Sequence, residues 1–422
     1  MKKNFKTGLI AGLLIGVLAT AGIGSAAFFA TDGFTNLTME KNRLDLRSIN
    51  ENIRDLETMI DEDYLNKKDN EQLEQYIYKG LLAGLGDPYS EYYTASEYKR
   101  LKTETTGNYC GIGVRIIQES KTMKTTVAEV FEDSPALEAG MEADDIIKAV
   151  NDVDVSTMDM DEIVNNHILG KEGTKIEMQV YRPSIKKTLS FDIERRQVEA
   201  QYVKSEMLQN KIGYISISSF AVATTNQFNS AIKNLRRQGA ESLIIDLRNN
   251  PGGVLNSAVD MLASLLPDGV LVYTKDKNGK GDHYESKDGQ IYYKNDNGYK
   301  DKAYPKKDSG KLELPMAVLI NGDSASASEV FAQAMKDYQW ATIIGTQSYG
   351  KGIVQNLIPL TDGTAVKLTV SSYYTKNGSV IQGKGVTPDI KVEQKGKWKN
   401  STLLPPHDED AQLQRAIKEL NQ

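Results

Sequence analysis

Three serines separated by alanines lie in the stretch NGDSASASEVFAQAMKD, residues 321 to 337. The apolar run LPMAVLI precedes this stretch and a helix-like pattern follows it, so the sequence predicts a strand, a tight turn and a helix. Free backbone N–H groups at the start of such a helix can stabilise an oxyanion, and a serine there could be a nucleophile. However, Ser326-x-x-Glu329 is also a capping box, in which the serine only caps the helix.

A nucleophilic serine needs a nearby group that takes its proton. The three histidines, His167, His283 and His407, are far from the serines in sequence, which disfavours a Ser-His-Asp arrangement without excluding it. Lys351, in SYGKGIVQ, is the other candidate base, since its flanking glycines allow a turn that aims the amine inward. An exposed lysine has a pKa of about 10.4, so burial would have to lower the pKa of Lys351 by about 2 to 3. A lysine exposed in a glycine turn is the alternative.

The elements that would position these residues begin at about residue 196. Apolar runs such as KIGYISI, SLIIDLRNNPGG and LPMAVLI alternate there with helix-like stretches, which indicates an α/β sheet covered by helices. The segment 271–313 is rich in Lys, Asp, Gly and Tyr, and we expect it to be a mobile cap or loop. A Pro-Pro break and an amphipathic stretch predict a C-terminal tail helix within 396–422.

Residues 99–195 follow another pattern, with short alternating runs and glycines that predict a small, mostly β module. This module resembles a PDZ domain, because Ile112-Gly113-Val114 matches the carboxylate-binding loop and Ser134-Pro135-Ala136 matches the turn before the short helix. Gly113 would let successive N–H groups turn toward a terminal carboxylate while a peptide adds a strand to the sheet edge. We interpret His167, within this module, as a surface or packing residue.

The N-terminus combines basic residues with a long uncharged stretch. Residues 8–30 carry no charge over a length that spans a bilayer, and Lys2, Lys3 and Lys6 precede them. The positive-inside tendency then places the N-terminus in the cytoplasm and the remaining chain outside. We therefore expect residues 1–31 to be a cytoplasmic stub and a single-pass membrane anchor, with the catalytic part extracytoplasmic. A signal peptide that is cleaved, followed by secretion, is the alternative.

A helical region is expected over residues 32–98. Five apolar residues recur there at spacings of three and four, as in a coiled-coil seam: Leu46, Ile49, Ile53, Leu56 and Ile60. Such a seam either pairs two copies of the chain or packs on its own domain.

Composition argues against several classes of partner and cofactor. The 422 residues carry a net charge of −6, with 51 basic and 57 acidic residues interspersed, so there is no basic stripe for nucleic acid. The single cysteine, Cys110, excludes an internal disulfide and a multi-cysteine zinc site. Nothing in the sequence implies a metal or an organic cofactor.

The stretches DLRNNPGG, SASASEVFAQAMKD and GTQSYGKGIVQ, in this order and after a PDZ-like module, resemble the carboxyl-terminal processing, or tail-specific, proteases. The resemblance covers most of the chain after about residue 40. It implies that Ser326 is the nucleophile, that Lys351, 25 positions later, is the base, and that Gln355 holds the lysine amine.

The same resemblance implies an oxyanion hole made by the backbone N–H of Ala327 and that of Gly252 or Gly253. Asp337 matches an acidic position of the family. Eleven residues of continuous helix would place Asp337 about 16 Å from Ser326 along the axis, so we expect Asp337 to give structural support.

The combined expectation is an α/β, crotonase-like or ClpP-like protease core over 196–395, with an inserted PDZ domain, an N-terminal helical region and one transmembrane helix. Its function would be that of an exported, membrane-anchored serine endopeptidase that binds substrate C-termini and cleaves with a Ser-Lys dyad. The resemblance also suggests a homodimer or larger homo-oligomer formed through the N- and C-terminal helices. A catalytically silent PDZ scaffold is the alternative, and an acyl-CoA enzyme of the crotonase type is a weaker one.

Overall fold

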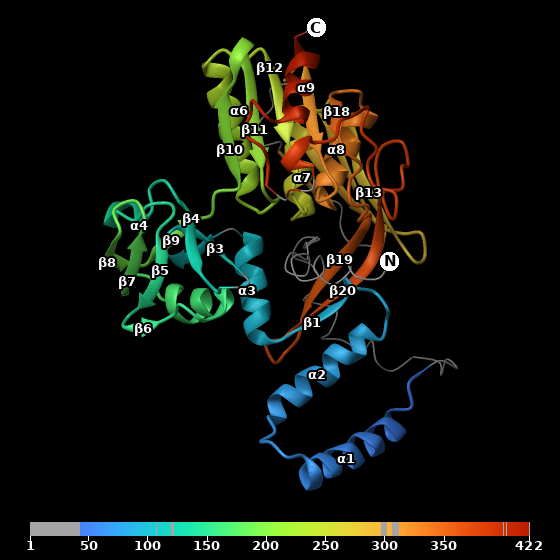
Figure 1. The fold of residues 1–422 in the computed structure, drawn as a ribbon. Helices are drawn as coiled ribbons and strands as arrows, with labels where there is room; N and C mark the ends of the chain where they lie inside the picture. The colour runs from blue at the N-terminus through green and yellow to red at the C-terminus, as the bar shows by residue number, and fades with distance from the viewer. Residues whose placement is uncertain are drawn as a thin grey trace. The chain divides into compact units, whose positions relative to one another are not determined.

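The computed structural model describes residues 43–106, 108–119, 122–296, 302–305, 312–399, 401 and 403–421 (Figure 1). The chain divides into two compact units. The described part of the first comprises 99–354 and 370–421, and that of the second runs up to residue 98 and includes 355–369. The predicted anchor, residues 8–30, lies outside the described residues. Among the helices that are described, none combines the length and the apolar character needed to cross a bilayer.

A six-stranded sheet forms the centre of the first unit. Its strands follow the order β10 (Val203–Met207), β11 (Ile212–Ile217), β12 (Ser242–Asp246), β17 (Met316–Ile320), β18 (Thr342–Gly345) and β21 (Ile390–Lys391). All neighbouring pairs are parallel except β10 with β11, which is antiparallel. The alternation of strands and helices predicted after residue 196 is thus confirmed.

Helices cover both faces of this sheet (Figure 1). One face packs against α6 (Thr224–Arg237), α7 (Leu255–Leu265) and α8 (Ala327–Asp337), and the other packs against α9 (Ala411–Leu420). Successive side chains of a strand point to opposite faces, so Ile215 and Ile245 join the first layer while Tyr214 and Ile244 join the second. Burial on both faces explains why β17 and the centre of β12, Leu243 to Ile245, are apolar runs.

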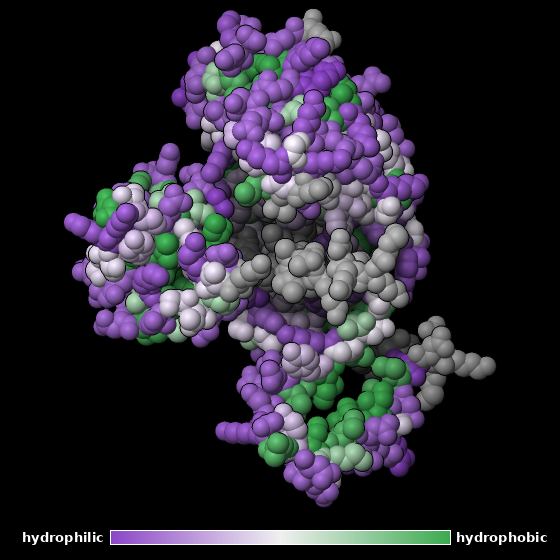
Figure 2. Space-filling model, in the orientation of Figure 1, coloured by the Kyte–Doolittle hydropathy of each residue, from purple (hydrophilic) through white to green (hydrophobic). Residues whose placement is uncertain are grey.

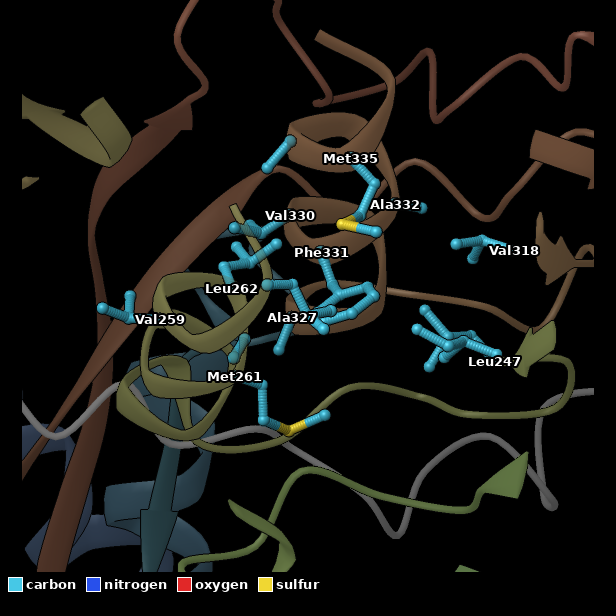
Figure 3. Packing of buried hydrophobic residues seen from close by; sticks show 14 of the residues in the cluster. Leu247, Val259, Met261, Leu262, Val318, Ala327, Val330, Phe331, Ala332 and Met335 are labelled. Atoms are coloured by element: carbon cyan, nitrogen blue, oxygen red, sulfur yellow. The ribbon is translucent and has the colours of Figure 1, made fainter. Parts of the chain in front are cut away.

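Apolar packing between α7 and α8 supports the turn at which α8 begins. Figure 3 shows Leu262 of α7 near Val330 and Phe331 of α8, and Met261, Leu247 and Val318 belong to the same cluster. The Phe331 ring lies 6.1 Å from that of Phe220 and 6.5 Å from that of Phe228, centroid to centroid. Each fully buried side chain of this size contributes about 1.5–3 kcal/mol. The first turn of α8 is therefore held in place by close packing against α7 and the neighbouring aromatic rings.

The described residues of the segment 271–313 form largely a sheet, so the expectation of a loop is wrong for them, while that of a mobile cap stays a prediction. β13 (Gly269–Asp276), β14 (Asp282–Lys287), β15 (Gln290–Asn295) and β16 (Lys302–Pro305) form antiparallel pairs, and β13 also pairs with β20 (Ala365–Tyr374). Leu271, Tyr284 and Ile291 are buried in the main core cluster. An antiparallel sheet needs apolar residues on one face only, so a polar composition does not exclude it.

The small β module has its own core and a five-strand path. The strands are β3 (Val114–Gln118), β4 (Thr125–Val130), β5 (Ile146–Val150), β7 (Lys175–Arg182) and β8 (Lys187–Glu194), and β6 (Val153–Asp154) pairs with β5. Three short helical segments complete the module: α4 (Pro135–Ala139), α5 (Met160–Glu162) and a π-helix (Ile163–Ile168). β2 (Asn108–Gly111) pairs with β9 (Arg196–Glu199), so the chain enters and leaves the module side by side.

The second unit contains α1 (Leu46–Asp63), α2 (Asn70–Ala83) and β1 (Glu91–Tyr93), which pairs with β20 at Lys367. β19 (Ile353–Pro359) reaches into this unit, and α3 (Ala95–Thr106) leads out of it. Within residues 46–83, neither helix contains a buried residue. Leu46 and Leu56 of the predicted seam are 69% and 58% exposed, and Figure 2 shows apolar side chains at the surface of both helices.

Candidate active site

The candidate nucleophile lies at the sharp turn between β17 and α8. Ser326 is the N-cap of α8, with backbone angles φ 55° and ψ −114°. A non-glycine residue in such a conformation carries about 1–3 kcal/mol of strain, which the surrounding contacts must hold. Ser326 is only 1% exposed. The predicted strand, turn and helix are therefore present, in a strained form that an ordinary cap does not need.

Of the two hydrogen bonds of a capping box, the one accepted by the glutamate carboxylate is present. Ser326 N donates to Glu329 Oε2 at 2.8 Å. Ser326 Oγ faces the Glu329 amide, yet that amide donates to Ser326 O at 2.8 Å, and Oγ makes no hydrogen bond of standard geometry within the described residues. The hydroxyl is thus not held as in an ordinary capping box, so capping alone does not account for this serine.

Lys351 is buried, with 4% exposure, so the alternative of a lysine exposed in a glycine turn is wrong. Its backbone N donates to Glu329 Oε2 at 2.8 Å. The glycines on both sides are needed, because Gly350 has φ +94° and a Cβ at Gly352 would come closer than 3.0 Å to Gln382 N. The lysine loop is further held by a hydrogen bond from Gly383 N to Gly350 O at 2.9 Å.

Gln355 and Asp337 are both held by other polar groups. Gln355, on β19, is buried, and its Nε2 donates to Thr369 Oγ1 at 3.2 Å. Its predicted hydrogen bond to the Lys351 amine stays a prediction. Asp337 ends α8 and accepts from Thr375 Oγ1 at 2.5 Å and from Asn377 N at 3.2 Å. These bonds tie the segment after β20 to α8, which is the supporting role expected of Asp337.

The glycine loop lies against the start of α8. A Cβ at Gly252 would be 2.9 Å from Ala327 N, which is the first amide of the helix. Gly252 N donates to Asn250 Oδ1 at 2.9 Å, so this amide is already occupied. Gly253 N makes no hydrogen bond within the described residues. Of the two glycines considered for the oxyanion hole, Gly253 is the one whose amide has no hydrogen bond among the described residues.

Asn250 is a site residue that the sequence analysis missed. Its backbone O accepts from Ala325 N at 3.0 Å and from Ser328 Oγ at 2.9 Å, and its side chain donates to Ile217 O at 2.8 Å. This residue therefore joins the glycine loop to the serine turn. Its position two residues before Gly252 was the signal available in the sequence, because Asn side chains bond their own backbone two residues on.

Tyr373, on β20, is a second site residue that the sequence analysis missed. Burial raises the pKa of Tyr373 to about 12, and an interaction with the Ser326 hydroxyl acts in the opposite direction. Tyr373 N donates to Gly352 O at 2.8 Å, so this residue meets both the serine turn and the lysine loop. The run SSYYTK gives no sign of which tyrosine points inward.

The histidines contact other parts of the chain. His283 Nε2 lies 3.0 Å from Asp296 Oδ2, and His407 Nε2 lies 3.6 Å from Glu206 Oε1. His167 is half-buried in the small β module, where its backbone O accepts from Arg195. In the part of the chain that the structure describes, no group of His, Cys, Asp and Glu could hold a metal ion.

The predicted carboxylate-binding loop has the backbone that its glycine requires. Gly113 has φ +81°, and a Cβ there would come closer than 3.0 Å to Ser134 Cβ. Ile112 O accepts from Ala136 N, and Gly113 O accepts from Phe131 N, both at 2.9 Å. The carbonyl groups of the loop are thus bonded within the module.

Together, the fold and this site define a class of protein: serine peptidases that carry a small β domain. A family model described as "Peptidase family S41" matches residues 211–392, and one described as "PDZ domain" matches residues 110–194. The chain is 34% identical to the "Carboxy-terminal-processing protease" of Bartonella bacilliformis over 336 residues, 78% of this chain and 72% of that protein. The chain therefore belongs to peptidase family S41, the carboxyl-terminal processing proteases, and contains a PDZ domain.

Two further comparisons give another similar relative and a solved structure of similar fold. The chain is 32% identical to a "Probable CtpA-like serine protease" of Staphylococcus epidermidis over 346 residues, and it spans 66% of the length of that relative and 82% of its own. A solved structure titled "Putative S41 protease from Bacteroides fragilis" shares the fold, with a TM-score of 0.52 at 16% identity, over 92% of this chain and 99% of that one.

Proposed function

We propose that the chain is a serine endopeptidase with Ser326 as nucleophile and Lys351 as general base. Lys351 takes the proton of Ser326 Oγ as this oxygen attacks the scissile carbonyl, and it passes the proton to the leaving amine. The amides of Ala327 and Gly253 stabilise the oxyanion, and Gln355 orients the lysine. Water then hydrolyses the acyl-enzyme and regenerates Ser326.

One observation carries the proposal. Ser326 and Lys351 are both buried, and their backbone amides donate to the same oxygen of Glu329. Two residues 25 positions apart in the sequence are thereby brought to one place. A buried serine and a buried lysine held together by the fold are what a Ser-Lys dyad requires.

The test uses the full chain in detergent, with an unstructured protein that ends in small apolar residues. Fragments are followed by mass spectrometry. We expect Ser326→Ala and Lys351→Ala to lower the rate by about 10³-fold or more while both variants stay folded. Lys211→Ala is the matched control, because Lys211 is exposed and pairs with Glu241 on the surface. Cleavage by Lys351→Ala at the wild-type rate would refute the base assignment.

Substrate selection through the PDZ domain is part of the proposal. Ile112, Gly113 and Val114 would receive a terminal carboxylate, and the inward hydrogen bonds of the Ile112 and Gly113 carbonyls support this, because they leave the backbone amides to face a ligand. Peptides with a free C-terminus should therefore bind more tightly than the same peptides amidated. Binding without shortening of the peptide, by wild type as well as by Ser326→Ala, would instead favour the silent scaffold.

We also propose that residues 8–30 anchor the protein in the membrane and that the protease part is extracytoplasmic. The support is the uncharged stretch that follows three lysines. Resistance of the chain to alkaline extraction from membranes, together with its digestion by protease added outside intact cells, tests both parts. Release of a shortened chain into the medium would favour the cleaved signal peptide.

Self-association through the N-terminal helices is the last part of the proposal. Exposed apolar residues on α1 and α2, among them Leu46, Leu56 and Leu81, support it, since large apolar patches at a surface mark sites of association. The C-terminal helix is less suited to this, because Leu413 and Ala416 of α9 are buried against the central sheet. Sedimentation of the full chain in detergent measures the state.

A further inference from the structure

We propose that Glu329 is a positioning residue that holds the nucleophile and the base at a fixed separation. One carboxylate oxygen, Oε2, accepts from Ser326 N and from Lys351 N, each at 2.8 Å. The two amide nitrogens are therefore within twice this distance of each other. The inference rests on the proposed function, since it assigns Glu329 a role in the Ser326–Lys351 dyad.

The second carboxylate oxygen holds the rest of the lysine loop. Oε1 accepts from Gly350 N at 2.7 Å and from Ser348 Oγ at 2.5 Å. Ser348 Oγ in turn accepts from Val386 N at 2.6 Å, so the proton of its hydroxyl points to Glu329. The carboxylate thus joins the start of α8, the loop before β19 and the segment at residue 386.

All four partners of Glu329 are donors, and this sets the chemical requirement. An ionised carboxylate offers acceptors only, so it can satisfy all four donors at once. A glutamine side chain would replace one of the two accepting oxygens by an NH2 group, which would face two of these four donors. Burial raises the pKa of Glu329, while the hydrogen bonds from Ser348, Gly350, Ser326 and Lys351 act in the opposite direction. The site is therefore shaped for the charged form despite the cost of burying it.

Other contacts between the two loops act further from the reacting groups. Tyr349 N donates to Ser324 O at 3.0 Å, two residues before each member of the dyad. Glu329 acts on the amides of Ser326 and Lys351 themselves, and Ser326 has the strained backbone that depends on such support. A displacement of about 1 Å between reacting groups can lower a rate by about 100-fold.

A cap and a positioning residue predict different results for Glu329→Gln. Glutamine serves as well as glutamate in a capping box, so a role in capping alone predicts an unchanged enzyme. We expect Glu329→Gln to lower kcat per active site by about 100-fold with KM unchanged. Active sites are counted by titration with a fluorophosphonate that labels Ser326, which separates a slow enzyme from a partly unfolded one.

The matched control is Glu97→Gln, in the capping box at the start of α3. Thr94 N donates to Glu97 Oε2 at 2.8 Å, and Glu97 N donates to Thr94 Oγ1 at 3.3 Å. This variant should keep the wild-type kcat. A Glu329→Gln enzyme within threefold of wild type in kcat per active site would overturn the inference.

Ser348→Ala keeps the test decisive if Glu329→Gln does not fold. It removes one of the four donors and leaves the carboxylate, so we expect kcat to fall by about three- to tenfold with KM unchanged. An unchanged kcat would overturn the inference. A failure of the proposed function would give a different result from a failure of this inference. The wild-type enzyme would then cleave no faster than Lys351→Ala, and the fluorophosphonate would label it no more than Ser326→Ala.

Discussion

Replacing Asp410 by Asn should destabilise the protease core, because Asp410 belongs to a buried cluster of charges. Arg248 Nη2 lies 2.8 Å from Asp410 Oδ2, and Arg248 Nε lies 2.9 Å from Asp246 Oδ1. All three residues are 4% exposed or less. Asp410 also caps α9, accepting from Gln412 N and Leu413 N. The cluster therefore fastens the C-terminal helix to the end of β12.

The substitution isolates the charge, since asparagine caps a helix as well as aspartate does. It leaves Arg248 with one carboxylate and turns one accepting oxygen into a donor that faces the guanidinium. Removing one partner of a buried ion pair costs about 3–5 kcal/mol of folding stability. Because Asp246 still pairs with Arg248, we expect a loss of about 3 kcal/mol, at the lower end of this range. A loss of this size lowers the unfolding temperature by about 6 °C or more.

The assay is urea and thermal unfolding of the full chain, with Glu419→Gln as control on the same helix. Arg415 and Glu419 form a partly exposed pair one turn apart, whose loss should cost less than about 0.5 kcal/mol. A loss below 0.5 kcal/mol for Asp410→Asn as well, at pH 7, would refute the reasoning.

The pH dependence gives a second check. Burial acts to raise the pKa of Asp410, but the hydrogen bond and charge of Arg248 outweigh it, so the pKa is lowered on folding. The stabilisation is therefore present above the ordinary carboxyl pKa of about 3.9 and is lost as the pH falls through the lowered value. Wild type and Asp410→Asn should then converge in stability in that acidic range.

Two other substitutions test the oxyanion loop and the N-terminal helices. A Cβ in Gly253→Ala would come closer than 3.0 Å to Phe220 O, so kcat should fall by about 100-fold or more. Gly80→Ala, which meets no atom within 4 Å, is the control and should leave kcat unchanged. Equal rates for the two variants would refute the role of Gly253. Leu56→Glu should shift the sedimentation of the full chain toward the monomer, with the exposed Glu62→Lys as control, and an unchanged profile would exclude Leu56 from an interface.

The order of motifs in the sequence was enough to predict the family. The parallel strands could also be predicted, because β17 and the centre of β12 are buried on both faces and are therefore apolar. The same holds for the glycines around Lys351, since a turn that only glycine can make is visible in the sequence. These features depend on residues close together in the chain.

Other features were decided by contacts between distant residues. Composition predicted a loop over 271–313, whereas β13 to β16 form a sheet that depends on pairing with β20, almost a hundred residues from the start of β13. The glycine amide available for an oxyanion depends on where the Asn250 side chain points. These outcomes depend on pairing partners and side-chain directions that local sequence patterns do not specify.

The pair Ser326 and Glu329 shows most clearly which features the sequence determines and which depend on the tertiary structure. The sequence by itself determined that a capping box and a candidate nucleophile coincide at the start of α8. Only the tertiary structure decided that the carboxylate of the box also binds the amide of Lys351, 22 residues further on. The reason is physical: a helix cap is a local hydrogen bond, whereas the meeting of two loops depends on how the sheet between them is packed.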